Sequence, residues 1–285
     1  MYKRQGKPGG GSDTDRRRTH IKLLLLTITM MLNTNLHATD DGNHSPVYDV
    51  KYKQIAGDGP LLLDLYYPAS VAPAAGYPLV VYTHGGGWAK GDRRIGDEGL
   101  KRMTLDALNE AGFCVASVDY RLCTRDGRVV MRDCVVDAKD AVRYLAKNAT
   151  KLSLDPYNIC TFGDSAGAHI AQMVLLSPAA SFGGDSALAD AEFRLVAGVS
   201  WYGPSDFEKT ELFERPDGVG NPDRFGDRIL KGDEDEDGKL AAYRQISPVN
   251  YLKADGPPLL MMQGELDPTM PVAHAEYMAE RAAVA

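Results

Sequence analysis

Short apolar strands that alternate with amphipathic helices are the feature that most restricts the fold of this chain. An antiparallel hairpin is predicted first, from Val47–Ile55 and Leu61–Tyr67. Helical one-face spacing follows over Leu100–Ala111, with Gly112 at the expected stop, and again over Ala138–Leu145. Five short apolar segments, each bounded by Gly, Pro or Asp, are typical of buried parallel strands: Leu79–Thr83, Phe113–Asp119, Ile159–Phe162, Val196–Trp201 and Leu259–Gln263. The alternation predicts an α/β fold, a mostly parallel sheet with helices on both faces.

The composition indicates one large globular domain and argues against nucleic acid as a partner. The chain has 285 residues, of which 44% are hydrophobic, and its formal net charge is -7. Because basic residues are concentrated before residue 23, the remainder is more acidic still and would repel a phosphate backbone. Four cysteines are too few for a disulfide scaffold of this length, and the absence of a CxxC pair argues against a zinc ribbon or a thioredoxin-like site.

The amino-terminal segment has the pattern of a processing signal. Three arginines and a lysine precede the ten uncharged residues Leu23–Leu32, and a polar stretch then ends at Ala38. This is typical of a secretory signal peptide and too short for a stable membrane span, although a short buried helix is the alternative. Residues 1–15 resemble neither a signal nor a domain. We therefore expect residues 1–38 to be an upstream extension and signal peptide, residues 39–285 to be the domain, and the location to be secreted or periplasmic.

The segment GDSAG, at Gly163–Gly167, carries the strongest chemical signal. It has the G-x-S-x-G pattern and lies between the apolar strand NICTF and the helical AGAHIAQMVLL, a context that makes the pattern specific. Ser165 should lie on a sharp strand-to-helix turn, where the flanking glycines avoid side-chain clashes. The start of the helix then places the Ala166 amide beside any oxyanion that forms when the serine attacks.

A second motif, HGGGW at His84–Trp88, directly follows the apolar strand LVVYT. Three consecutive glycines lose much backbone entropy on folding, so they suggest a place where the main chain must approach something closely. A substrate carbonyl that develops negative charge and needs amide donors is such a partner. The alternative is a flexible loop, but the position at the end of a central strand favours an oxyanion loop.

With these motifs the chain resembles α/β-hydrolases of the hormone-sensitive-lipase and acetyl-esterase type. The matching segments are HGGGW, DYRL, GDSAG, WYGPSD, and SPVNYL followed by QGELDP, and they cover roughly residues 47–280. The resemblance implies the α/β-hydrolase fold with an eight-stranded sheet, a serine nucleophile, and ester hydrolysis without metal or cofactor. It also implies an oxyanion hole from Gly85, Gly86 and Ala166. Asp267 is then the acid of the catalytic triad, in preference to Glu265.

The histidine of the triad is where the chain departs from this family. Related sequences place it after the helix that follows the acid and one further strand, whereas this chain stops at Ala285, inside the helix PVAHAEYMAERA. His169 lies one helical turn beyond Ser165 and is interpreted as a packing residue. His274 follows Asp267 by only seven residues and is the remaining substitute. We expect the carboxyl-terminal strand and the catalytic histidine to be missing, so that the chain as written aggregates or lacks ester turnover.

An acidic segment after residue 232 has two interpretations. Asp233, Asp235, Asp237 and Gly238 reproduce the opening of an EF-hand calcium loop. Arg244, however, stands where the loop needs a bidentate glutamate. An acidic, solvated loop that leads into a helix is therefore favoured over a calcium site, and no metal is expected.

The four cysteines divide into two kinds. Cys123 and Cys134 flank the charged segment TRDGRVVMRD, and a secreted location would allow them to form a disulfide. Cys114 and Cys160 fall inside predicted strands and are expected to be buried thiols. Whether the first pair is bridged stays open at this level.

The sequence as a whole predicts a secreted serine carboxylic-ester hydrolase that acts on short-acyl or carbohydrate-linked esters through an acyl-enzyme. Ser165 would attack the ester carbonyl while a histidine oriented by Asp267 takes its proton. A serine peptidase of the prolyl-oligopeptidase kind shares the fold but usually lacks an HGGG loop, and a non-catalytic binding module on the same fold is the other alternative. The expected partner is a small-molecule or carbohydrate ester, with neither nucleic acid nor a stable membrane span.

Overall fold

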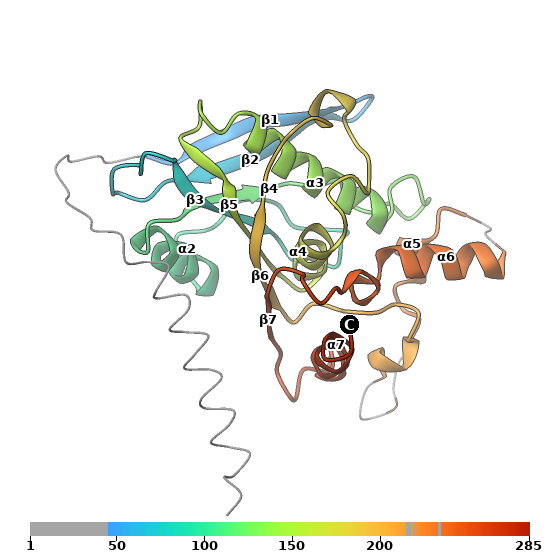
Figure 1. The fold of residues 1–285 in the computed structure, drawn as a ribbon. Helices are drawn as coiled ribbons and strands as arrows, with labels where there is room; N and C mark the ends of the chain where they lie inside the picture. Colours follow the sequence, from blue (N-terminus) through green and yellow to red (C-terminus); the bar gives the residue numbers. More distant parts are fainter. Residues whose placement is uncertain (1–44, 215–217, 219–220, 233–234) are drawn as a thin grey trace, which may run out of the picture. The chain divides into compact units, whose positions relative to one another are not determined.

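The computed structural model describes residues 45–214, 218, 221–232 and 235–285, and these residues form a mixed sheet with helices on both faces (Figure 1). The sheet has seven strands in the order β1-β2-β4-β3-β5-β6-β7. They are β1 (Val47–Ile55), β2 (Gly59–Tyr66), β3 (Tyr77–Thr83), β4 (Cys114–Val118), β5 (Leu154–Asp164), β6 (Leu195–Trp201) and β7 (Leu259–Met262). β2 pairs antiparallel with β1 and with β4, and all other neighbours are parallel. The predicted hairpin and mostly parallel sheet are confirmed, with seven strands in the described range where the resemblance implied eight.

The helices lie on both faces of the sheet, as the alternation predicts. They are α2 (Leu100–Glu110), α3 (Met131–Lys147), α4 (Ala166–Leu176), α5 (Gly226–Ile229), α6 (Glu236–Ile246) and α7 (Ala273–Ala282), with single 3-10 turns at Ser186–Leu188, Thr210–Phe213 and Pro248–Tyr251. Successive side chains of β4 point to opposite faces of the sheet, so they show which helix covers which face. Ala116 belongs to the cluster that includes Met131 of α3 and Ile170 of α4, whereas Val115 packs in the cluster of Leu105 from α2. α3 and α4 therefore cover one face and α2 lies on the other (Figure 1).

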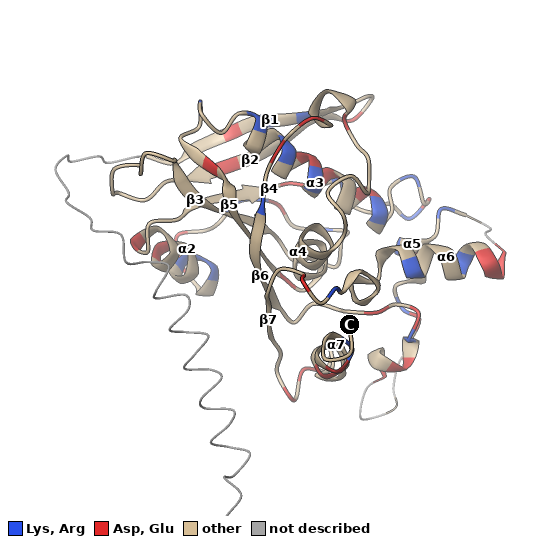
Figure 2. Cartoon of the chain, viewed as in Figure 1, with Lys and Arg blue, Asp and Glu red and all other residues tan. Residues whose placement is uncertain are grey.

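α4 is the central helix, and it is buried along its whole length. All its residues are buried, and it is drawn entirely in tan because it carries no charged side chain (Figure 2). It contacts β3, β5 and β6 along the middle of the sheet. None of the helices in the described ranges has the length and hydropathy needed to cross a membrane. Residues 1–38, predicted to be an extension and signal peptide, lie outside the described residues.

β7 is the edge strand of the sheet within the described residues. Its side chains alternate between half-buried and exposed. Leu259 and Met261 pack against the cluster that contains Met278 of α7. On the opposite face, Leu260 is 39% and Met262 50% exposed. The apolar side chains of β7 therefore pack against α7 on one face of the sheet and are exposed at the surface on the other face.

A buried charge network joins β1 to α3, and charges of both signs lie along α3 in Figure 2. Lys53 Nζ of β1 is 2.6 Å from Asp137 Oδ1 and 2.6 Å from Asp140 Oδ2, and both carboxylates are fully buried. Arg121, from the segment after β4, donates Nε to Asp137 Oδ2 at 2.7 Å. Because a buried carboxylate is tolerated only when it is paired, these contacts fix where α3 crosses the sheet.

Removing one member of this network should destabilise the fold strongly. Asp137→Ala leaves Lys53 and Arg121 without their shared carboxylate, so we expect the free energy of unfolding to fall by about 3–5 kcal/mol in urea denaturation. Asp126→Ala is the matched control, because Asp126 pairs with Arg128 at the surface and its loss should leave stability unchanged. Equal stability of the two variants would show that the network does not hold α3.

Candidate active site

The carboxyl ends of β3, β5, β6 and β7 lie at one edge of the sheet, and the sequence-predicted site residues leave the sheet there. Thr83 at the end of β3 pairs with Gly163 of β5, and Trp201 at the end of β6 pairs with Met262 of β7. The loop His84–Trp88, called the oxyanion loop after the role that the sequence predicts for it, follows β3 directly. In parallel α/β sheets the crevice outside the carboxyl strand ends is where ligands bind. The topology therefore brings the motifs HGGGW, GDSAG and QGELDP to the same edge.

Ser165 occupies the sharp turn between β5 and α4 that the sequence predicts. Its backbone has φ 51° and ψ −119°, a left-handed conformation that is strained for a residue other than glycine. Its N–H donates to Trp201 O at 2.8 Å. A Cβ on Gly163 would collide with the carbonyl of Gly167, and a Cβ on Gly167 would collide with the carbonyl of Thr83. The two flanking glycines thus permit the close packing that forces the serine into this turn.

The oxyanion loop is held to the serine turn by Asp164. The Gly85 N–H donates to Asp164 Oδ1 at 2.9 Å, and the Tyr82 hydroxyl donates to the same oxygen at 2.5 Å. The Gly85 amide therefore already has a partner, which the sequence did not indicate. For the amides of Gly86 and Ala166, the other two expected donors, the described residues supply no hydrogen-bond acceptor. A free amide at the first position of α4 is what a helix start provides.

His169 is a packing residue, as interpreted from the sequence. Its Nδ1 accepts a hydrogen bond from Trp88 Nε1 at 3.1 Å, and its Nε2 lies 2.7 Å from the carbonyl of Ile246 and donates to it. Both ring nitrogens are thus engaged. Full burial lowers the pKa of His169 to about 4, so the imidazole is neutral and accepts the hydrogen bond that holds Trp88, the last residue of the oxyanion loop.

His274, the substitute base considered from the sequence, is fully buried and hydrogen-bonded to Ser205. Its Nδ1 accepts from the Ser205 N–H at 3.2 Å, and its ring meets Phe213 edge to face with centroids 4.3 Å apart. Burial, with a smaller contribution from the charge of Arg224, lowers its pKa to about 3. Within the described ranges no hydrogen bond joins His274 to Ser165, and its buried Nε2 has no partner there. Its nearness to Asp267 in the sequence therefore does not make it a base.

Asp267 is fixed in the loop after β7. Its Oδ1 accepts from the Thr269 N–H at 2.8 Å and from the Met270 N–H at 3.0 Å, as in an Asx turn. It is half-buried, whereas Glu265 is exposed. Tyr202, which has φ 45°, lies within the electrostatic reach of two acids: burial raises its pKa, and the charges of Asp164 and Asp267 raise it further. Because β7 runs parallel to β6, the loop after β7 that carries Asp267 lies at the same edge of the sheet as the serine turn.

Three residues near the site were not identified from the sequence. Asp164 is the variable position of G-x-S-x-G, and Tyr202 lies in WYGPSD, so for both of these the motif itself was a signal. Arg228 of α5 donates Nη1 to Gly87 O. No sequence pattern marks that arginine, because 141 residues separate it from the glycine.

The acidic segment that resembled a calcium loop begins a helix. Asp235 accepts from the Gly238 N–H at 2.8 Å and so caps α6. Asp237 lies in the first turn, where negative charge is favourable. Asp233 lies outside the described residues, and in the described ranges no group of three or more His, Cys, Asp or Glu side chains is arranged to hold a metal ion.

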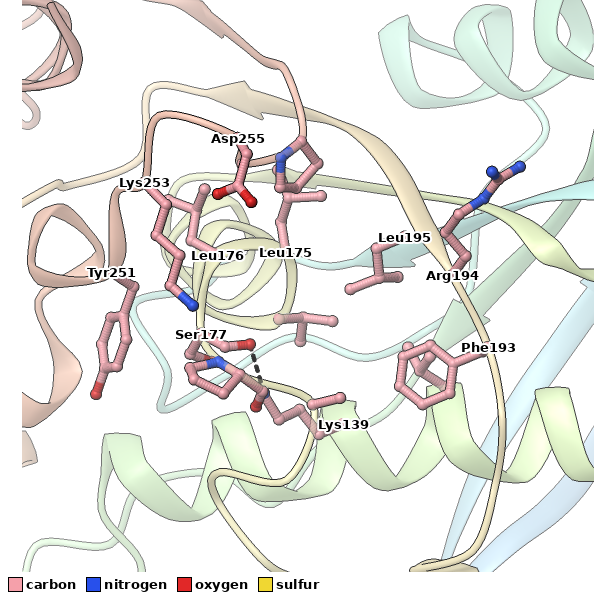
Figure 3. A pocket seen from close by; sticks show the side chains of 16 residues that line it. Lys139, Leu175, Leu176, Ser177, Phe193, Arg194, Leu195, Tyr251, Lys253 and Asp255 are labelled. Atoms are coloured by element: carbon pink, nitrogen blue, oxygen red, sulfur yellow. Dashed lines mark hydrogen bonds between the residues drawn. The ribbon is translucent and has the colours of Figure 1, made fainter. Parts of the chain in front are cut away.

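A cavity of about 370 Å³ opens at the other end of α4 (Figure 3). Leu175, Leu176 and Ser177 line it, so about 16 Å of helix separates it from Ser165. Lys139 points into this region, but its Nζ donates to Ser177 O, Pro178 O and Ser181 Oγ. Since all three donors are used, Lys139 holds the chain after α4 and the cavity lies apart from the candidate site.

The buried neutral histidines predict a loss of stability in mild acid. Unfolded His169 and His274 take up protons below about pH 6.5, whereas the folded groups do so only near pH 4 and pH 3. The unfolded state therefore binds more protons between these values, and the free energy of unfolding must fall as the pH falls from 6.5 toward 4. Well below pH 6.5 each histidine contributes about 1.4 kcal/mol per pH unit. Urea denaturation between pH 7 and 5 should show a shallower slope for His169→Gln, and an unchanged slope would contradict the assignment.

Comparison with known proteins identifies the family. The family model described as BD-FAE matches residues 63–282. The probable carboxylic ester hydrolase LipM of Mycobacterium tuberculosis is 26% identical over 70% of this chain and 43% of its own length, and esterase LipQ of the same organism is 27% identical over 75% and 48%. A solved structure of a thermophilic esterase from Thermogutta terrifontis, with butyrate bound, aligns with a TM-score of 0.65 and 26% identity over 84% of this chain and 79% of that one. The chain spans less than half the length of the two curated relatives. It belongs to the BD-FAE family of hormone-sensitive-lipase-like α/β-hydrolases.

Proposed function

We propose that this domain hydrolyses carboxylic esters with a short acyl group or a carbohydrate alcohol, through an acyl-enzyme on Ser165. The observation that carries the proposal is the left-handed turn that presents Ser165 at the carboxyl edge of the sheet, where the amides of Gly86 and Ala166 have no acceptor among the residues that the structure describes. Relatives described as a carboxylic ester hydrolase and an esterase support the reaction class. The butyrate bound to the similar thermophilic esterase supports a short acyl group.

The reaction begins when Ser165 Oγ attacks the ester carbonyl carbon. Negative charge then develops on the carbonyl oxygen, and the N–H groups of Gly86 and Ala166 are the donors available to hold it. The Gly85 N–H can join them only by leaving Asp164. The alcohol departs with the serine proton, and water cleaves the acyl-enzyme to release the acid.

The proton of Ser165 requires a base that an acid orients. Asp267, held by the amides of Thr269 and Met270, is the acid in this proposal. His169 and His274 are both engaged elsewhere, so the proposal gives neither of them the role of base. The proposal therefore requires a further histidine, which Asp267 would orient and which would take the proton from Ser165 and return it to the leaving alcohol. Among the described residues, no hydrogen bond joins Asp267 to a histidine ring.

The nucleophile can be tested by covalent labelling. In the full-length protein a fluorophosphonate should label Ser165, and Ser165→Ala should lose both labelling and hydrolysis of p-nitrophenyl butyrate. Ser186→Ala removes an exposed hydroxyl far from the motif and should keep both. Labelling that persists in Ser165→Ala would overturn the assignment. Labelling at Ser165 together with turnover of peptide amides, but not of esters, would favour a peptidase.

The acid can be tested by exchanging one carboxylate at a time. Asp267→Asn keeps an oxygen that can accept from Thr269 and Met270, so we expect an unchanged melting temperature and a fall in kcat of roughly 10⁴-fold. Glu265→Gln makes the same chemical change two residues away on an exposed side chain and should leave kcat near the wild-type value. A larger effect from Glu265→Gln would show that the wrong carboxylate has been chosen.

A further inference from the structure

Two cysteine thiols lie against each other behind the oxyanion loop. Cys123 Sγ, in the segment after β4, is 3.8 Å from Cys134 Sγ, in the first turn of α3. Cys123 is half-buried and Cys134 is fully buried. The sulfur atoms of a disulfide are about 2.0 Å apart, so these two sulfur atoms have to approach each other by a further ~1.8 Å (3.8 − 2.0) to bond. A reagent from solution would meet Cys123 first.

The thiol pair is linked directly to the backbone of the oxyanion loop. The Cys123 N–H donates to Trp88 O at 2.7 Å. Cys123 Sγ also lies 3.9 Å from the carbonyl of Arg228, whose guanidinium donates to Gly87 O. Cys123 thus holds Trp88 through its own N–H and contacts the arginine that holds Gly87.

The other two cysteines do not share this arrangement. Cys114 lies in β4 and Cys160 in β5. In the part of the chain that the structure describes, neither has a sulfur neighbour within hydrogen-bond distance. Burial raises the pKa of the Cys160 thiol to about 11 and raises that of Cys114 further. Burial also raises the pKa of Cys134, so the difference lies in the second thiol: without one, neither Cys114 nor Cys160 can close an internal disulfide. They serve as internal controls in the same molecule.

We propose that Cys123 and Cys134 are a modification site, at which a low-molecular-weight disulfide of the glutathione type converts the two thiols into an intramolecular disulfide that braces the oxyanion loop. The crosslink itself is independent of the esterase proposal, whereas its consequence for catalysis rests on that proposal.

The chemistry is thiol–disulfide exchange in two steps. The Cys123 thiolate attacks one sulfur of the reagent, forms a mixed disulfide and expels one reagent thiolate. The Cys134 thiolate then attacks Cys123 Sγ, forms the internal disulfide and expels the second thiolate. The two cysteine protons end on the two expelled thiolates, so the protein is oxidised by two electrons and the reagent is reduced to two thiols. Burial raises the pKa of the Cys134 thiol, so the second step should limit the rate and accelerate as the pH rises.

The test is chemical mapping of the full-length protein. After incubation with oxidised glutathione, the protein is unfolded, its free thiols are alkylated, and the digest is analysed by mass spectrometry. We expect a peptide containing Cys123 crosslinked to one containing Cys134, with Cys114 and Cys160 alkylated, and reversal by dithiothreitol. The Cys160→Ser variant should give the same crosslink. Alkylation of all four thiols, or glutathione retained on Cys123, would overturn the proposal.

The stabilising effect has its own readout. Closing this short loop should raise the melting temperature of the oxidised wild-type protein by about 5 °C and leave that of Cys123→Ser unchanged by the reagent. If the esterase proposal holds, ester turnover of the oxidised form should also survive heating for longer. A crosslink found in a protein without ester turnover would contradict only the proposed function. Ester turnover without a crosslink would contradict only the present inference.

Discussion

The close approach of the first turn of α4 to the end of β3 is the constraint on which the rest of the site depends. The carbonyl of Thr83 lies where a Cβ on Gly167 would be, and the Thr83 hydroxyl donates to Gly167 O at 2.7 Å. This contact leaves no room for a gradual passage from β5 into α4. The chain therefore turns within one residue, and Ser165 takes the left-handed conformation. Asp164, just before the turn, is thereby directed to the Gly85 N–H of the oxyanion loop.

Much of the fold could be predicted because buried parallel strands read as short apolar runs. The departures have particular causes. β5 starts at Leu154, whereas the sequence predicts a start at Ile159. The first residues were missed because Pro156 interrupts the apolar run, and their pairing with β3 is irregular. α3 starts at Met131, whereas the apolar spacing predicts a start at Ala138. The first two turns were missed because their buried face includes charged residues, among them Asp133 and Asp137, which the search for apolar spacing does not count. Partners on β1 and after β4 neutralise the carboxylate of Asp137, and single-sequence patterns do not contain that pairing.

The candidate site could be predicted only in part, again because contacts between distant segments are not contained in local sequence patterns. Motifs locate backbone geometry, so Ser165 and the glycine loop were predicted together with the turns that hold them. Contacts between distant segments, such as Arg228 with Gly87 or His169 with Trp88, leave no local pattern. His274 illustrates the reverse case, since its neighbour in space is Ser205, 69 residues away, and not the serine turn.

The central claim is that Ser165 becomes acylated during turnover. Acid quenching of the full-length protein during hydrolysis of p-nitrophenyl butyrate, followed by digestion and mass spectrometry, tests it directly, because acid traps the ester before water cleaves it. The account predicts a butyryl group on the peptide that contains Ser165, and on no other peptide. Turnover with the acyl group on a different residue, or sustained turnover with Ser165 never modified in samples quenched before the steady state, would contradict it.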